Sequence, residues 1–207
     1  MIYPQKNKLI TWFFHGYVLR LVDKNFQQVK YNLLAVDSDK SVLLLANHFS
    51  WWDGFLMYYL NHRLFKKQFH VMVIEETVQK VSFFKYMGAF SVQKNSRDVV
   101  ASLNYAAELL NDPQNLVLIF PQGKLFSNFT GEVVFEKGLV KIIQQAAGKF
   151  QTVLAATFIE NLQYKKPTAS VYLAAADISG SESIAELKQV YQQHYHNAQK
   201  QQTQIAV

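Results

Sequence analysis

An apolar run, Val42-Leu43-Leu44-Leu45, ends at Ala46-Asn47-His48-Phe49-Ser50-Trp51-Trp52-Asp53-Gly54, where a second periodic segment begins. Residues five apart point about 140° away from each other on a helix and to opposite faces on a strand. His48 and Asp53 therefore cannot pair inside either element. They can meet if His48 lies on the turn after a strand and Asp53 lies in the first turn of the next helix.

Ser50 supports this arrangement, because Ser-x-x-Asp ahead of apolar residues at helical spacing is typical of a capped helix start. The pattern predicts a helix that begins near Trp51. A histidine held by a carboxylate suits general-base chemistry, since the ordinary histidine pKa of ~6.5 lets it accept a proton from an alcohol near neutral pH. The alternative is that Asp53 only caps the helix and His48 is an ordinary loop residue.

Two later segments bear on this choice: Gly88-Ala89-Phe90-Ser91-Val92-Gln93-Lys94 and Phe120-Pro121-Gln122-Gly123. Together with Asn47-His48-x4-Asp53 they resemble, in order and spacing, the glycerolipid acyltransferase superfamily, which includes 1-acyl-glycerol-3-phosphate and lysophospholipid acyltransferases. The resemblance covers residues 40–160.

The chain departs from the family pattern at five positions. Ser91 stands where the family prefers Phe, Lys94 replaces Arg, Gln122 replaces Glu, Lys124 replaces Thr and Leu125 replaces Arg. Lysine keeps a positive charge but lacks the planar fork that binds phosphate through two hydrogen bonds. These departures favour an acceptor without phosphate and leave the His-Asp pair intact.

The resemblance implies transfer of an acyl group from a thioester, acyl-CoA or acyl-carrier protein, to an acceptor hydroxyl, with no cofactor. His48 would be the base and Asp53 would orient it. We expect further substrate-binding residues at Asn47, Lys94, Arg97, Gln122, Gly123 and Lys124. A backbone N–H near Gly123 could stabilise the oxyanion, or Gly123 could serve only a tight turn. The three basic side chains could hold phosphate of the acceptor or of the donor's pantetheine arm, or could simply be solvated.

Three functions remain open. The first is a lysophosphatidic acid or lysophospholipid acyltransferase. The second is an acyltransferase for a lipid-like hydroxyl without phosphate, which the missing arginine favours. The third is a non-catalytic lipid-binding member of the family, against which the retained His48 and Asp53 argue. Six aromatic side chains could line an acyl groove or belong to the core: Trp51, Trp52, Phe55, Phe90, Phe120 and Phe126.

The composition indicates one ordinary domain with a large core, because 50% of the 207 residues are hydrophobic. The net charge of +6 comes from scattered lysines with no nucleic-acid motif, which favours an anionic membrane and a phosphorylated acyl carrier over nucleic acid. The chain has no cysteine, which excludes a thiol nucleophile and fits a reducing compartment. No histidine spacing suggests a metal site.

The first 22 residues predict an amphipathic helix over Asn7 to Val22, more apolar than an ordinary surface helix because Trp12 and Leu19 lie on its polar side. We expect residues 1–30 to form a membrane-associating helix and residues 31–207 a single α/β acyltransferase domain. The protein would then be cytoplasmic and peripheral on the inner face of the membrane, without crossing it. The alternative is that this helix packs on the protein itself.

The remaining sequence alternates between apolar runs and periodic segments, which predicts an α/β fold with a largely parallel sheet flanked by helices. We expect strands at 41–46, 69–74, 89–93, 115–120, 151–158 and 169–175. We expect helices at 51–65, 76–86, 97–111, 136–148 and 181–197. His48, Lys94 and Gln122 each follow a predicted strand, so they should line one edge of the sheet.

Overall fold

The computed structural model describes residues 1–93, 98–146, 150–178 and 183–207. Its strands are β1 (Gln28–Tyr31), β2 (Ser41–Ala46), β3 (Gln68–Ile74), β4 (Ala89–Val92), β5 (Asn115–Ile119), β6 (Phe150–Glu160) and β7 (Thr168–Ala176). Its α-helices are α1 (Lys8–Asn25), α2 (Asp53–Leu60), α3 (Glu75–Lys80), α4 (Asp98–Leu109), α5 (Gly138–Gln145) and α6 (Ile184–Gln202). Two short helices, the π-helix η1 (Asn61–Phe65) and the 3-10 helix η2 (Ser82–Met87), follow α2 and α3.

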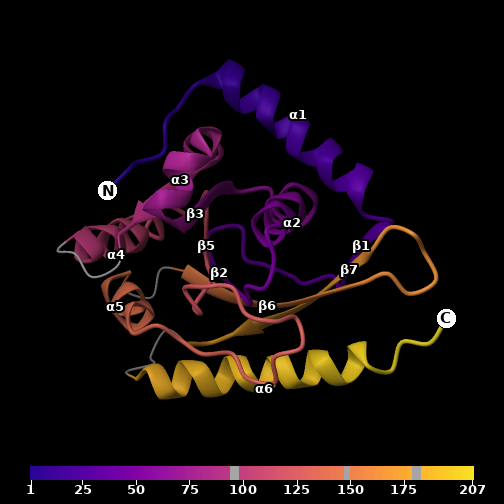
Figure 1. Cartoon of the computed structure of the whole chain (residues 1–207). Coiled ribbons are helices and arrows are strands. Elements are labelled where there is room, and N and C mark those ends of the chain that lie inside the picture. The colour runs from indigo at the N-terminus through magenta and orange to yellow at the C-terminus, as the bar shows by residue number, and fades with distance from the viewer. Residues whose placement is uncertain (94–97, 147–149, 179–182) are drawn as a thin grey trace.

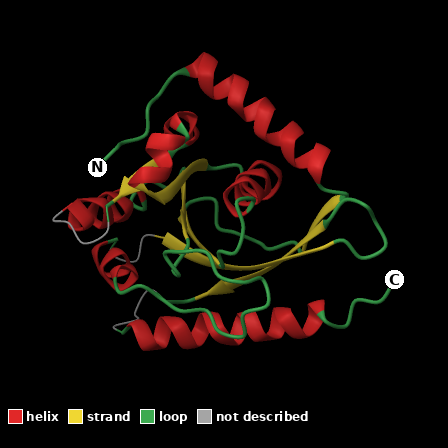
Figure 2. Ribbon diagram, in the orientation of Figure 1, coloured by secondary structure: helices red, strands yellow, loops and turns green. Residues whose placement is uncertain are grey.

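The seven strands form one sheet in the order β1-β7-β6-β2-β5-β3-β4. The strands β4, β3, β5, β2 and β6 run parallel, and β7 is antiparallel to β6. The predicted α/β fold with a largely parallel sheet is therefore confirmed (Figure 2). Strand β1, which pairs with β7, was not predicted, because its four residues alternate weakly and reach their partner only through the tertiary fold.

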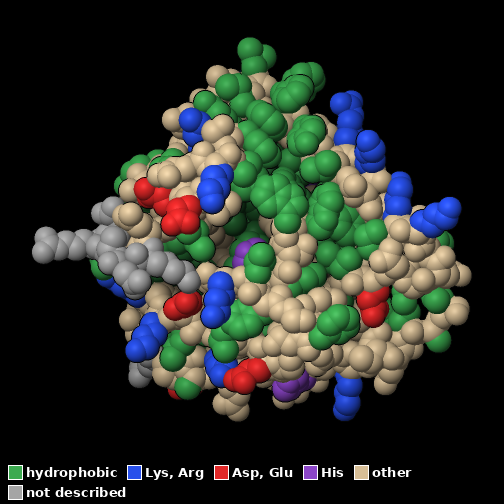
Figure 3. Space-filling view, in the orientation of Figure 1, with side chains coloured by type: hydrophobic (Ala, Val, Ile, Leu, Met, Phe, Trp, Pro, Cys, Tyr) green, Lys and Arg blue, Asp and Glu red, His purple; other side chains and the backbone are tan. Residues whose placement is uncertain are grey.

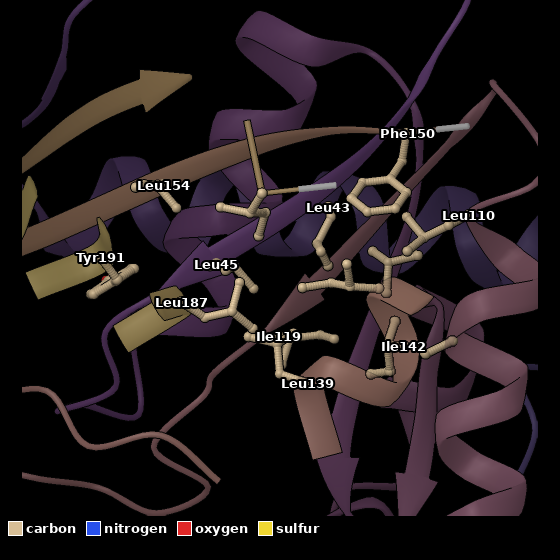
Figure 4. Packing of buried hydrophobic residues seen from close by; sticks show 14 of the residues in the cluster. Leu43, Leu45, Leu110, Ile119, Leu139, Ile142, Phe150, Leu154, Leu187 and Tyr191 are labelled. Carbon is tan, nitrogen blue, oxygen red and sulfur yellow. The ribbon is translucent and has the colours of Figure 1, made fainter. Parts of the chain in front are cut away.

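Helices cover both faces of the sheet (Figure 1). Strand β2 is buried throughout and divides its side chains between two cores: Leu43 and Leu45 face one, and Val42 and Leu44 the other. The first core contains residues of α4, α5 and α6 (Figure 4), and the second contains residues of α1 and α2. Because β2 is central in the sheet, its carboxyl end lies in the middle of the molecule.

Two predicted helices are broken by local geometry. The segment predicted at 51–65 begins at Asp53, changes to the π-helix η1, and ends where Lys66 adopts a left-handed conformation with φ of 55°. The segment predicted at 76–86 divides at Val81 into α3 and η2. It stops at Gly88, whose φ is 87° and where a Cβ atom would lie 1.8 Å from the carbonyl oxygen of Phe69. The helix end predicted at Gly148 lies outside the described residues.

Helix α1 packs on the domain through one side only. Val18 and Val22 are buried in the core shared with α2, and His15 Nδ1 lies 2.9 Å from Tyr58 Oη. The outward side is apolar in the first half, where Leu9 is 80% exposed and Trp12 is 75% exposed. The domain boundary expected at residue 30 falls inside β1. The chain that follows α1 therefore forms a strand of the sheet.

Within the described part of the chain, no helix combines the length and apolarity that crossing a bilayer requires.

Candidate active site

The site begins where β2 ends, and Asn47 holds that end to β6. The Asn47 side-chain amide donates to Thr157 O at 2.9 Å and its oxygen accepts from Thr157 N at 2.8 Å. Asn47 is buried, so its side chain extends the ladder between the two strands by one residue pair. In the structure this side chain therefore binds β6, and the expected substrate contact of Asn47 stays a prediction.

The backbone of His48 is held on both sides by the segment that follows β5. Its N–H donates to Gln122 Oε1 at 2.6 Å, and its carbonyl oxygen accepts from the N–H of Phe126 at 3.0 Å. Gln122 is also buried and its side chain binds the His48 backbone. The expected substrate contact of Gln122 stays a prediction.

The predicted pairing of His48 with Asp53 is present. His48 Nδ1 lies 2.8 Å from Asp53 Oδ2, which also accepts the N–H groups of Phe49 at 2.7 Å and Ser50 at 2.9 Å. Asp53 therefore orders the turn and contacts the imidazole, and the alternative in which Asp53 only caps the helix is wrong. The expected helix start was wrong: Trp51 and Trp52 form a turn in which the Ser50 hydroxyl accepts from Trp52 N, and α2 begins at Asp53.

Burial raises the pKa of Asp53, against the opposing hydrogen bonds from His48, Ser50 and Phe49. Its second oxygen, Oδ1, is buried without a hydrogen-bond partner among the described residues. The ionised carboxylate only accepts hydrogen bonds, so the imidazole donates through Nδ1 and carries its lone pair on Nε2. The side chain of His48 is 26% exposed, and Phe120 stacks on it with ring centroids 4.2 Å apart.

The other expected binding residues differ in their placement. Gly123 has a φ of 60°, and its N–H donates to Phe120 O at 3.1 Å, so this amide is engaged in the turn. Lys124 is exposed with its Nζ 5.2 Å from the centre of the Phe126 ring, two residues before the amide that contacts His48. Lys94 and Arg97 lie outside the described residues.

Of the candidate groove aromatics, Phe55 and Phe90 are core residues, whereas Trp51 is exposed beside the site. Trp51 begins a series of aromatic contacts that the sequence did not reveal. Its ring lies 5.8 Å from Phe84, Phe84 lies 5.0 Å from Phe83, and Phe83 stacks on Phe14 of α1 at 4.4 Å. Figure 3 shows apolar side chains gathered from α1 down to a hollow in which a histidine lies.

Across the described ranges, no group of three or more His, Asp or Glu side chains is arranged to hold a metal ion.

A family model described as Acyltransferase matches residues 23–158 of this chain. The fold is similar to the crystal structure of the 1-acyl-sn-glycerophosphate (LPA) acyltransferase PlsC from Thermotoga maritima, with a TM-score of 0.71 and 16% sequence identity. That similarity covers 97% of this chain and 83% of the other. No curated protein matches this chain.

Proposed function

Because the chain belongs to the acyltransferase family, we propose that it moves a fatty acyl group from an acyl thioester to a hydroxyl of a lipid-like acceptor. The observation that carries this proposal is the 2.8 Å contact between His48 Nδ1 and Asp53 Oδ2 at the carboxyl end of β2. It leaves Nε2 of a partly exposed imidazole as a base for the acceptor. Acyl-CoA and acyl-carrier protein are the two donor classes.

In this mechanism His48 Nε2 takes the proton of the acceptor hydroxyl as its oxygen attacks the thioester carbonyl carbon. The C–O bond forms, the C–S bond breaks, and the imidazolium returns the proton to the departing thiolate. Asp53 stabilises the transient imidazolium, since its Oδ2 accepts the Nδ1 proton. In this mechanism transfer is direct, and the chain has no cysteine that could form a thioester of its own.

The aromatic series from Trp51 to Phe14 supports an apolar substrate that approaches the base from the side of α1. The outward side of α1 carries Leu9, Trp12 and Phe13, which are all exposed. Arg20 and Lys24 are exposed further along the same helix. Exposed aromatic and aliphatic residues next to cations suit a membrane interface. We therefore place the protein on the surface of an anionic membrane, with the outer side of α1 in the headgroup layer.

The surroundings of the site support an acceptor without phosphate. Leu125 is 55% exposed at the position where the resemblance calls for a guanidinium, and its neighbour Lys124 offers only a point charge. A site that selects phosphate gains most from a forked donor. The sugar or glycerol hydroxyl of a neutral lipid fits these residues better than a lysophosphatidic acid.

A second candidate is lysophosphatidic acid acylation, which the shared fold with PlsC supports. The third, lipid binding without turnover, is disfavoured by the intact contacts of His48 with Asp53 and Gln122.

The test is an assay of purified protein with labelled acyl-CoA or acyl-carrier protein and a panel of lipid alcohols, read by mass spectrometry. The panel pairs each phosphorylated acceptor with its dephosphorylated counterpart. Acylated neutral alcohols are the expected products. Binding of the lipids without any acylated product from either donor would replace catalysis by lipid binding.

A further inference from the structure

The C-terminal helix α6 contributes a buried hydroxyl beneath the site. Tyr191 is fully buried, and its Oη donates to the carbonyl oxygen of Ala155 at 2.7 Å. Figure 4 shows Tyr191 near Leu187 and Leu154, within the core that α6 shares with the sheet. The helix begins after residue 158, where the family model stops.

This hydroxyl lies where β2 gives way to the histidine. Ala155 is the register partner of Ala46, the last residue of β2. The next residue, Asn47, is bonded through its side chain to Thr157. The stretch of β6 from Ala155 to Thr157 therefore positions the end of β2 and the residues that follow it. Tyr191 donates to the first carbonyl group of this stretch, that of Ala155.

The Tyr191 hydroxyl lies in fully buried surroundings. Burial raises the pKa of Tyr191 strongly, and the N–H of Asn47 opposes that rise. Its hydrogen bond is the one with Ala155, whose carbonyl group lies in β6 beside the last residue of β2. If the strand end moved, the buried hydroxyl and the carbonyl group of Ala155 would lose each other as partners. The cost of leaving them unsatisfied resists displacement of the turn.

We propose that Tyr191 is a positioning residue for the reaction. Its hydroxyl binds α6 to β6 at Ala155, beside the end of β2, and thereby fixes where the His48 imidazole lies. This inference rests on the proposed acyl transfer for its kinetic consequence only. Its structural consequence, a more mobile backbone at residues 47 and 48, is independent of catalysis.

The chain offers a matched control one turn along the same helix. Tyr195 is also fully buried, and its Oη donates to Thr130 O at 3.0 Å, a carbonyl with no contact to the β2 end. Tyr191→Phe and Tyr195→Phe therefore remove the same group from the same helix, and each keeps the ring that fills the core. Only the first removes a contact behind the histidine.

The experiment compares both variants with the wild-type chain by amide hydrogen exchange, thermal unfolding and steady-state kinetics. Tyr191→Phe should raise exchange at Asn47 and His48 by about tenfold or more and lower kcat by about tenfold, with the KM for the acyl donor unchanged. Tyr195→Phe should lower the unfolding temperature to a similar degree and leave exchange at those two amides and kcat as in the wild type.

Equal exchange at Asn47 and His48 in the two variants would overturn the proposal, as would a loss of kcat that follows unfolding temperature in both. If the wild-type chain transfers no acyl group to any acceptor, the proposed function fails, and the exchange measurement still decides the role of Tyr191.

Discussion

One oxygen of Asp53, Oδ2, receives the Nδ1 proton of His48 at 2.8 Å and, from the same turn, the N–H groups of Phe49 and Ser50. The turn and the base are thus ordered by a single atom. Three donors on one oxygen favour the ionised carboxylate and offset part of the cost of its burial. The orientation of the imidazole is then a property of the folded turn and exists before substrate binds.

His48→Ala should lower kcat by ~10²–10⁴-fold, because it removes the general base. The protein should still fold, since the side chain is partly exposed and lies outside both cores. Part of the unfolding free energy should be lost, because Asp53 Oδ2 then keeps only the N–H groups of Phe49 and Ser50. Steady-state kinetics and urea unfolding measure the two quantities. His62→Ala, on the exposed side of η1, is the control and should retain full turnover; near-normal turnover by His48→Ala would exclude the mechanism.

Asp53→Asn should reduce kcat, because a neutral amide no longer stabilises the imidazolium. Its effect on stability depends on pH. Burial raises the folded-state pKa of Asp53 above its value in the unfolded chain, so ionising this carboxyl costs stability as pH rises through the folded-state value. The unfolding free energy of Asp53→Asn minus that of the wild type should therefore be more positive at pH 7 than at pH 4. A constant difference between the two pH values would contradict the raised pKa.

Gln122→Ala should leave the buried N–H of His48 without its acceptor, at a cost of ~1–3 kcal/mol in unfolding free energy. Displacement of the imidazole should lower kcat by about tenfold. Gln122→Glu keeps an oxygen acceptor at the same position and should restore turnover. If both variants lose turnover equally, the amide has a role besides accepting the His48 N–H.

A triple variant, Leu9→Gln, Trp12→Gln and Phe13→Gln, should bind anionic liposomes at least about a hundredfold more weakly, since each apolar side chain contributes ~1.5–3 kcal/mol when fully buried. Liposome pelleting measures this. Deletion of residues 1–22 is a poorer test, because it would also remove the buried Val18 and Val22. Val190→Gln on the distant helix α6 is the control, and unchanged pelleting of the triple variant would show that α1 serves packing alone.

The acceptor is tested by kcat/KM for a lysophosphatidic acid and for its dephosphorylated monoacylglycerol. We expect kcat/KM for the neutral acceptor to be at least as high as for the phosphorylated one. Leu125→Arg should not raise kcat/KM for the neutral acceptor. A hundredfold preference for the phosphorylated compound, on the order of 3 kcal/mol, would establish lysophosphatidic acid acylation instead. In that case Lys94→Ala and Lys124→Ala should each raise the acceptor's KM, whereas for a neutral acceptor neither should.

Much of the fold and the central pair could be predicted from local patterns. The apolar run of β2 and the alternation with periodic segments indicated a parallel sheet, because strands buried on both faces must be apolar throughout. His48 and Asp53 lie five residues apart, so the turn between them limited how they could meet. Helix ends were predicted less well: the π-helix η1 and the break at Val81 arise from backbone geometry that side-chain periodicity does not encode.

By itself, the sequence determined the α/β class, the pairing of His48 with Asp53 and the order of the motifs around the site. The tertiary structure alone decided the hydrogen-bond partners of Asn47 and Gln122, which are Thr157 and His48 and lie 110 and 74 positions away along the chain. It also decided that β1 is a strand, that aromatic rings connect α1 to Trp51, and that the Tyr191 hydroxyl binds the carbonyl group of Ala155. The physical reason is the range of each interaction: a turn constrains neighbours in sequence, whereas a buried amide or hydroxyl takes whichever partner the packed sheet and helices bring to it.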